Sequence, residues 1–114
     1  MRSSLVSKKT FRTPTADAEP VTHALQDIVE TLQKALRRKD VRAGSLALAI
    51  RYDTGDKKVQ TKILPRPTRS HNYIYSNSLK LLSGVVSRNG KKIRTMELSL
   101  RSLVSAKTPV GQKS

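Results

Sequence analysis

The fold is decided by the stretch Ser45–Leu64, which reads SLALAIRYDTGDKKVQTKIL. Apolar residues alternate with small or polar ones both before and after its centre. The centre, Asp53–Asp56, has the composition of a turn. Alternation with period two on both sides of a turn predicts an antiparallel β-hairpin with one buried face and one exposed face.

A four-residue turn at Asp53–Asp56 sets the expected register of this hairpin. One face would then carry nearly all the apolar side chains, in the cross-strand pairs Tyr52–Lys57, Ile50–Val59, Leu48–Thr61 and Leu46–Ile63. The opposite face would carry the rungs Ala47–Lys62, Ala49–Gln60 and Arg51–Lys58. Cations beside alanines favour a polyanionic partner, because small side chains let a large molecule approach the backbone amides. An ordinary solvated sheet face is the alternative.

Two further strands and two amphipathic helices flank the hairpin. Strand patterns cover Leu5–Phe11 and Ile93–Arg101. Helical periodicity covers about twenty residues from Asp17 onward, and a second segment from Ser70 to about Val86. The first helix carries an apolar stripe at three- and four-residue steps, made of Val21, Leu25, Ile28, Val29, Leu32, Ala35 and Leu36. Both helices can therefore cover one face of a sheet.

Breaker and turn residues separate these elements. Thr13–Thr15 and Asn89–Gly90 are expected to end the elements before them, and Pro65–Arg69 is expected to form an extended basic loop. Residues 1–104 then form one domain, and residues 105–114 a disordered basic tail. The order β-α-β-β-α-β predicts a two-layer α+β fold, with a four-stranded antiparallel-type sheet and two helices on one face.

The charge of the chain is its strongest compositional feature. Its 114 residues contain 23 Lys and Arg but only eight Asp and Glu, a formal net charge of +15. Five of the eight acids and four of the bases lie between Asp17 and Asp40, which leaves 19 bases and three acids for the remainder. The basic end of the first helix, Arg37–Lys39, is assigned to capping, because cations are favourable near the negative end of the helix dipole. A binding role for it is the alternative. The large excess of cations indicates a negatively charged partner such as a nucleic acid.

Cations are expected to gather on the uncovered face of the sheet. Alternation places Arg51, Lys58, Lys62 and Arg101 on that face, with Lys91, Lys92, Arg94, Arg66 and Arg69 at its rims. Tyrosine and phenylalanine fall mostly at core positions, so a platform for stacking single-stranded bases is missing. The pattern favours contacts to phosphates.

Several kinds of chemistry are excluded. The chain has no Cys and only two His, so a disulfide scaffold or a cysteine-based metal site is ruled out. Phosphate-binding loops, glycine-rich dinucleotide loops, nucleophile elbows and His-Glu metal helices are absent from the sequence. Asp53 and Asp56 flank Gly55 and are assigned to the turn. No apolar run approaches the length of a membrane span. None of these sequence motifs therefore points to a catalytic site.

Seven features occur in a characteristic order between Ser4 and Val104. They are Lys9–Phe11 ending the entry strand, the long amphipathic helix, Ile50–Tyr52, Pro65–Thr68, Ser78–Leu82, Lys92–Arg94 and Leu98–Leu103. In this order they resemble the little-finger domain, the C-terminal DNA-binding domain of the Y-family translesion DNA polymerases (the impB/mucB/samB family).

The resemblance implies a function and a set of contacts. In that family the domain lies in the DNA major groove beside the primer–template duplex and holds phosphates on both sides. Carried over by position, the phosphate contacts are Ser4, Ser7, Lys8, Arg51, Lys58, Lys62, Lys92, Arg94, Thr95, Ser99 and Arg101. The implied partners are primer–template DNA, the palm, finger and thumb domains of the same polymerase, and the sliding clamp as a further candidate. The catalytic carboxylates and their Mg²⁺ would belong to the palm, so this domain alone would have no enzymatic activity and would need no cofactor. The resemblance implies a cytoplasmic, nucleoid-associated protein in a bacterium, or a nuclear one in a eukaryote.

Two departures from the family pattern are visible. Glu97 stands where the family usually has glycine, and the tail Ala106–Ser114 has no glutamine-plus-aromatic clamp-binding signature. Glu97 would face the phosphates or be neutralised by a neighbour such as Arg101. Two other readings of the charge stay open, namely an RNA- or ribosome-binding module and a protein-interaction domain that uses the basic sheet.

Overall fold

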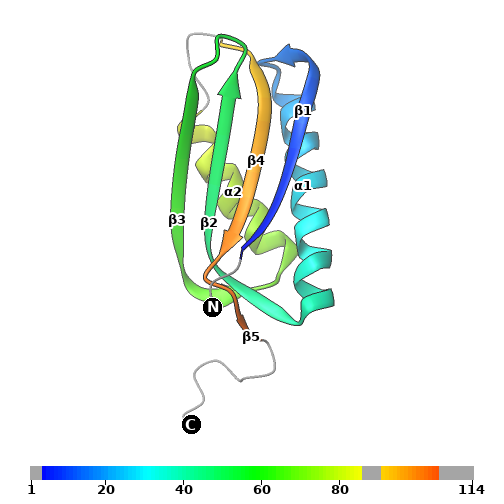
Figure 1. Cartoon of the computed structure of the whole chain (residues 1–114), viewed down its shortest axis with the longest axis vertical. Helices are drawn as coiled ribbons and strands as arrows, with labels where there is room; N and C mark the ends of the chain where they lie inside the picture. The colour runs from blue at the N-terminus through cyan, green and yellow to red at the C-terminus, as the bar shows by residue number, and fades with distance from the viewer. Residues whose placement is uncertain (1–3, 86–90, 106–114) are drawn as a thin grey trace.

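The chain forms the predicted two-layer α+β fold, with a short fifth strand added at its end (Figure 1). The computed structural model describes residues 4–85 and 91–105. The elements are β1 (Leu5–Thr15), α1 (Ala18–Lys39), β2 (Val41–Tyr52), β3 (Lys57–Thr68), α2 (His71–Val85), β4 (Ile93–Arg101) and β5 (Val104–Ser105). The break predicted at Asn89–Gly90 and the tail from residue 106 lie outside the described residues.

The sheet is antiparallel throughout, with the strand order β1-β4-β2-β3. β2 and β4 are central, and β1 and β3 form the two edges. Both helices cover the same face of the sheet and leave the other face open (Figure 1). β5 pairs with the start of β2, where Ser105 lies opposite Val41. The first residue of the predicted tail is therefore part of a strand.

The apolar stripe of α1 faces the sheet as predicted. Val21, Leu25, Ile28, Leu32 and Leu36 are all buried. Below them the alternating apolar residues of the central strands form the other half of the core, namely Leu46, Leu48, Ile50 and Tyr52 of β2 and Met96, Leu98 and Leu100 of β4. The end of α1 is held by Arg69, whose Nη1 donates to Asp40 Oδ1 at 3.2 Å. Central strands and helices thus have the packing that their sequence patterns predict.

Two segments predicted as breaks are strands instead. β1 continues through Pro14 to Thr15, and β3 continues through Pro65 and Pro67 to Thr68. Proline lacks an N–H group and is tolerated in a sheet mainly on edge strands. β1 and β3 are both edge strands, which explains why these prolines do not end them.

The predicted hairpin register is wrong by one residue. Arg51 lies opposite Lys57, Ile50 opposite Lys58 and Ala49 opposite Val59. The turn is longer than predicted because it includes Tyr52. The Tyr52 N–H donates to Asp56 O at 2.8 Å, and the Tyr52 carbonyl accepts from the Gly55 N–H at 2.9 Å. Gly55 has φ of 97°, a conformation that glycine adopts without strain.

This one-residue shift moves every β3 side chain to the other face of the sheet. Lys58, Gln60 and Lys62 share the face that the helices cover, because they lie opposite the buried Ile50, Leu48 and Leu46. Val59 and Ile63 lie on the open face and are 53% and 84% exposed. The open face is consequently more apolar along β3 than the sequence pattern predicts.

Candidate nucleic-acid interface

The open face of the sheet is defined by the side chains that point away from both helices. Strand pairing arranges them in rungs that run from β1 through β4 and β2 to β3. The rungs are Thr10–Thr95–Arg51–Lys57, Lys8–Glu97–Ala49–Val59, Val6–Ser99–Ala47–Thr61 and, from β4 onward, Arg101–Ser45–Ile63. Each strand of this face therefore contributes a side chain to at least three rungs.

Four cations surround a centre of small side chains on the open face. Lys8, Arg51, Lys57 and Arg101 are exposed, and each stands on a different strand. Between them lie small residues that rise little above the backbone, namely Ala47, Ala49 and Ser99. A hollow of about 90 Å³ lies among Lys8, Arg51, Lys57, Thr95 and Glu97, with Ala49 beside them. This arrangement lets a large anion approach the sheet while cations from four strands reach it.

The predicted phosphate contacts divide into three groups. Lys8, Arg51, Thr95, Ser99 and Arg101 do lie together on the open face. Lys58 and Lys62 do not, because of the register shift. Ser7 also faces the helix side, since it lies opposite the buried Leu98. The expectation that Lys58 and Lys62 lie on the open face is therefore wrong. Whether any of these residues touches DNA stays a prediction.

The remaining predicted residues lie at the ends of the strands. Ser4 directly precedes β1 and is exposed. Lys92 precedes β4, and its carbonyl accepts from Asp53 N–H at 2.9 Å. Arg94 Nη1 donates to Phe11 O at 3.4 Å. Lys57, by contrast, is an open-face cation that the sequence reasoning missed, because the assumed turn gave it the opposite orientation.

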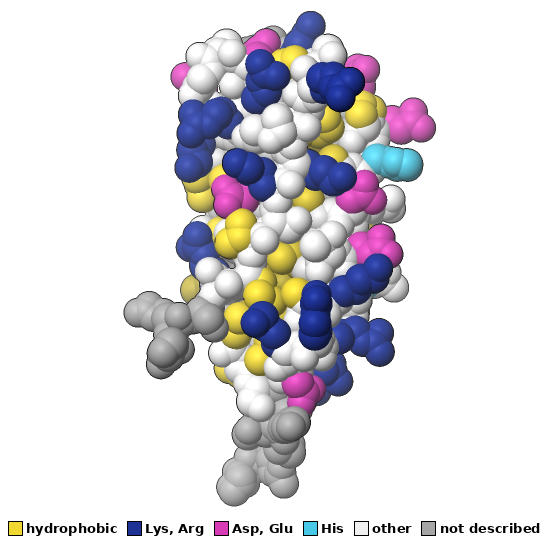
Figure 2. All heavy atoms as spheres, turned by 45° about the vertical axis from the view of Figure 1, so that its right-hand side comes forward, with side chains coloured by type: hydrophobic (Ala, Val, Ile, Leu, Met, Phe, Trp, Pro, Cys, Tyr) yellow, Lys and Arg dark blue, Asp and Glu magenta, His cyan; other side chains and the backbone are white. Residues whose placement is uncertain are grey.

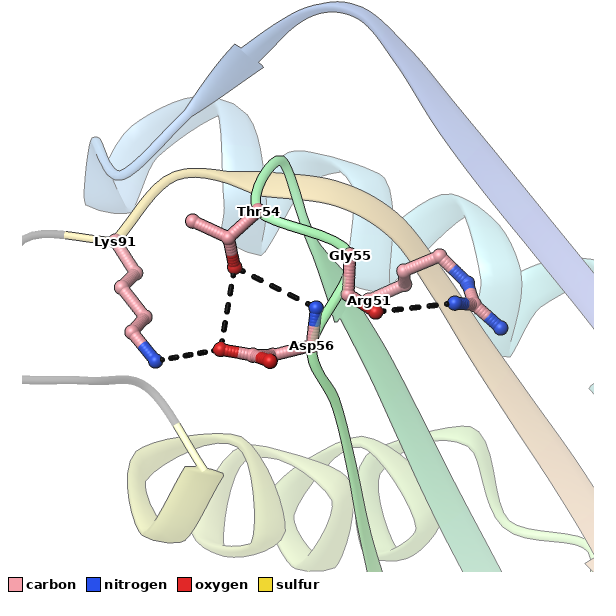
Figure 3. Close-up of polar contacts among 5 residues, drawn as sticks. All are labelled: Arg51, Thr54, Gly55, Asp56 and Lys91. Atoms are coloured by element: carbon pink, nitrogen blue, oxygen red, sulfur yellow. Dashed lines mark hydrogen bonds and ion pairs between the residues drawn. The ribbon is translucent and has the colours of Figure 1, made fainter.

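The tip of the hairpin is fixed to the start of β4 by a small polar network (Figure 3). Lys91 Nζ lies 2.9 Å from Asp56 Oδ2, and the Thr54 hydroxyl donates to the same oxygen at 3.2 Å. Arg51 Nη1 donates to Gly55 O at 3.2 Å (Figure 3). The network orients Arg51 at the rim of the open face.

Charges in this network act on two titratable groups. The hydrogen bond from Lys91, together with its positive charge, lowers the pKa of the Asp56 carboxyl. Burial raises the pKa of the Tyr52 hydroxyl, and the Lys91 charge opposes that rise. Lys91 Nζ lies 5.6 Å from the centre of the Tyr52 ring. One lysine therefore connects the turn, an aromatic ring and β4.

The acidic side chains lie mainly on the helix side of the molecule. Figure 2 brings the α1 side forward, where acidic side chains form a row along the right-hand edge while Lys and Arg predominate elsewhere. Two of these acids pair with nearby lysines, Asp27 with Lys9 at 3.5 Å and Glu30 with Lys34 at 3.7 Å. These two acids of α1 thus pair with lysines that lie outside the open face.

Two negative findings apply to residues 4–85 and 91–105. No three His, Asp or Glu side chains there lie close enough together to bind a metal ion. None of the helices in that part of the chain has the length and apolar character needed to cross a membrane.

Several solved structures share this fold. A Y-family DNA polymerase chimera of Dbh and Dpo4 is similar with a TM-score of 0.77 and 15% identity, over 92% of this chain and 30% of that one. The crystal structure of DinB from Sulfolobus solfataricus gives a TM-score of 0.74 and 13% identity, over 90% of this chain and 29% of that one. The little-finger domain of PolIV, solved in complex with the β-clamp processivity factor, gives 0.69 and 11%, over 98% and 96% of the two chains. The chain thus spans about 30% of the polymerase chains but nearly all of the isolated little-finger domain.

A family model gives the assignment at the level of sequence. No curated protein sequence matches the chain. The model of the impB/mucB/samB family C-terminal domain, however, matches residues 2–114. The chain therefore belongs to the impB/mucB/samB family, as its C-terminal domain, and has the little-finger fold of the Y-family DNA polymerases.

Proposed function

We propose that this domain holds the primer–template DNA duplex for a translesion polymerase through contacts to phosphates rather than to sequence. The observation that carries the proposal is the open face, where Lys8, Arg51, Lys57 and Arg101 stand on four strands around small central side chains. Phosphate contacts hold a protein on DNA without reading sequence, and cations supply their strength. The membership in a family of DNA polymerases supports the same partner.

The polymerase reaction belongs to the rest of the proposed parent protein. The chain corresponds to about 30% of the polymerase chains it resembles. In this proposal the palm carries the catalytic carboxylates and Mg²⁺, while this domain positions the duplex and resists its dissociation. Loss of the domain would then reduce the number of nucleotides added per binding event more than it reduces the rate of the chemical step.

Salt dependence provides the test of the duplex proposal. Each phosphate contact releases counterions and contributes about 0.9 to the slope of log affinity against log salt concentration. A random-sequence duplex titrated at several salt concentrations should give a slope that corresponds to roughly 4 to 7 phosphates. A flat response to salt would contradict the proposal.

The same titration separates the two other readings. A structured RNA of equal length and charge is the matched competitor. Preference for that RNA over the duplex would favour an RNA- or ribosome-binding module. Tight binding to an acidic protein without affinity for either nucleic acid would favour a protein-interaction domain.

A sliding clamp is a second proposed partner. The PolIV little-finger domain that this chain resembles was solved with the β-clamp. At the end of β3, beside the start of α2, a hollow of about 430 Å³ is lined by Pro65, Pro67 and Tyr73, with Arg66 and Thr68. Its lining is mainly apolar, which suits a protein contact better than a phosphate contact. Clamp binding that survives Tyr73→Ala would place the contact elsewhere.

A further inference from the structure

Glu97 is an acid in the middle of a surface that is otherwise suited to anions. It lies on the central strand β4, between Lys8 of β1 and Ala49 of β2. Its side chain is half-buried, and none of the ion pairs within 4 Å among the described residues involves it. It is the single Asp or Glu in the rungs of the open face as described. The carboxylate is therefore available to a molecule that lies on this face.

The neighbours of Glu97 leave it accessible to a large partner. Ala49 and Ser99 are small, and the hollow of about 90 Å³ opens between Glu97 and the cations Lys8, Arg51 and Lys57. A duplex drawn in by those cations would bring some of its atoms to within reach of the carboxylate. Those atoms cannot be phosphate oxygens, because a carboxylate accepts hydrogen bonds and phosphates have none to donate.

The spacing of the strands selects the part of the duplex that reaches Glu97. Neighbouring strands lie about 4.8 Å apart, so the edge strands β1 and β3 are separated by roughly 14 Å. The DNA major groove is about 12 Å wide and admits a two-stranded ribbon. With β4 and β2 in the groove, Lys8 and Lys57 on the edge strands face the phosphates on its two sides. Glu97 then faces the edges of the bases.

We propose that Glu97 accepts a hydrogen bond from the N4 amino group of cytosine in the major groove. This inference rests on the proposed function and adds base recognition to binding that is otherwise directed at the backbone. Carboxylates pair with the cytosine amino group in the major groove, where this group is an exposed donor. Repulsion between the carboxylate and the phosphates is offset by this bond only where cytosine lies opposite Glu97. The domain should accordingly hold some sequence contexts more tightly than others.

The experiment compares two duplexes of the same sequence, one unmodified and one with N4-methylcytosine at every cytosine. The methyl group replaces the amino hydrogen that points into the major groove, and the pairing hydrogen remains. Wild-type domain should bind the methylated duplex roughly fivefold more weakly, at the low end of the discrimination that a good side-chain–base pair gives. Glu97→Ala should bind both duplexes equally.

Two further variants separate charge from hydrogen bonding. Glu97→Gln keeps an accepting oxygen without the charge, so it should bind both duplexes more tightly than wild type and still prefer the unmodified one. Glu30→Ala removes an exposed acid from α1 and should keep the wild-type preference. Circular dichroism of each variant verifies that it is folded.

Three results would overturn the inference. Equal wild-type binding to both duplexes, with Glu97→Ala tightening both by one factor, would make Glu97 a source of repulsion only. A preference that persists in Glu97→Ala would assign base recognition to another residue. Failure of the wild type to bind either duplex would reject the proposed function itself, and the base contact with it.

Discussion

The covered and open faces of one sheet differ in what their side chains do. On the covered face, Leu48, Ile50 and Leu98 are fully buried under the helices. On the open face, the residues beside them in sequence are small or charged, such as Ala49, Arg51 and Glu97. The same two strands therefore stabilise the fold through one set of alternate residues and present charge through the other. Because the two sets point in opposite directions, substitutions on the two faces should change different measurements.

The largest expected effect is on stability, from the covered face. Leu48→Ala removes a fully buried side chain at the centre of the core and should lower the free energy of unfolding by roughly 2 to 5 kcal/mol. Urea denaturation measures the loss. Thr61→Ala, on the exposed side of β3, is the control and should change stability by less than about 0.5 kcal/mol. Comparable losses in both variants would mean that the two faces are not distinct in packing.

The next effect is on DNA binding, from the open face. Lys8→Ala with Lys57→Ala should weaken duplex binding for all sequences alike and lower the salt slope by up to about two, since each removed cation gives up about one phosphate contact. Fluorescence anisotropy at several salt concentrations measures both quantities.

The matched control for that pair is Lys58→Ala with Lys62→Ala, which removes the same charge from the helix side of β3. The salt slope of this control should lie closer to the wild-type slope than does the slope of the variant with Lys8→Ala and Lys57→Ala. An equal loss in both pairs would show that the total charge matters and that the face does not.

The smallest effect concerns acid stability of the hairpin tip. Lys91 lowers the pKa of the Asp56 carboxyl below its ordinary value of 3.8. Because the Asp56 pKa is lower in the folded state than in the unfolded state, the ionised carboxylate stabilises the fold above pH 3.8. This stabilisation is lost as the pH falls through the lowered pKa. Asp56→Asn should therefore have a slightly lower urea midpoint than wild type at pH 7, and the difference should shrink below pH 3.8.

Asp53→Asn tests whether that effect is specific. Asp53 lies in the same turn and makes its hydrogen bond to Lys92 through its backbone N–H. The same loss of charge there should leave the midpoint and its pH dependence nearly unchanged. If Asp53→Asn and Asp56→Asn lowered the urea midpoint equally, the effect would come from the net charge of the turn.

Sequence alone predicted the central part of this molecule because neighbouring strands and one layer of helices constrain its packing. β2 and β4 each have two neighbouring strands and a layer of helix, so the alternation of Leu46, Leu48 and Ile50 has only one workable orientation. The stripe of α1 is equally constrained. Element order and fold class followed from these patterns and are confirmed.

The edges were harder to predict because burial does not constrain them in the same way. Val59 and Ile63 look like core residues in sequence, yet as members of an edge strand they lie exposed on the open face. The turn length decided the register, and the inclusion of Tyr52 in it could not be inferred from composition. The positions of Lys57, Lys58 and Lys62 on their faces follow from that one turn. The two-residue strand β5 has no pattern long enough to predict.

The lysines and prolines of β3 also affect pairing with other molecules, because β3 is an edge strand of the sheet. An edge strand exposes unpaired backbone groups that invite a strand from a second molecule. Antiparallel pairing of two β3 strands would bring Lys57, Lys58 and Lys62 of both copies into one narrow ribbon, and Pro65 and Pro67 have no N–H to give to it. Self-association into a continuous sheet is thereby disfavoured. Lys58 and Lys62, which the register places on the covered face, thus oppose pairing of two β3 edges.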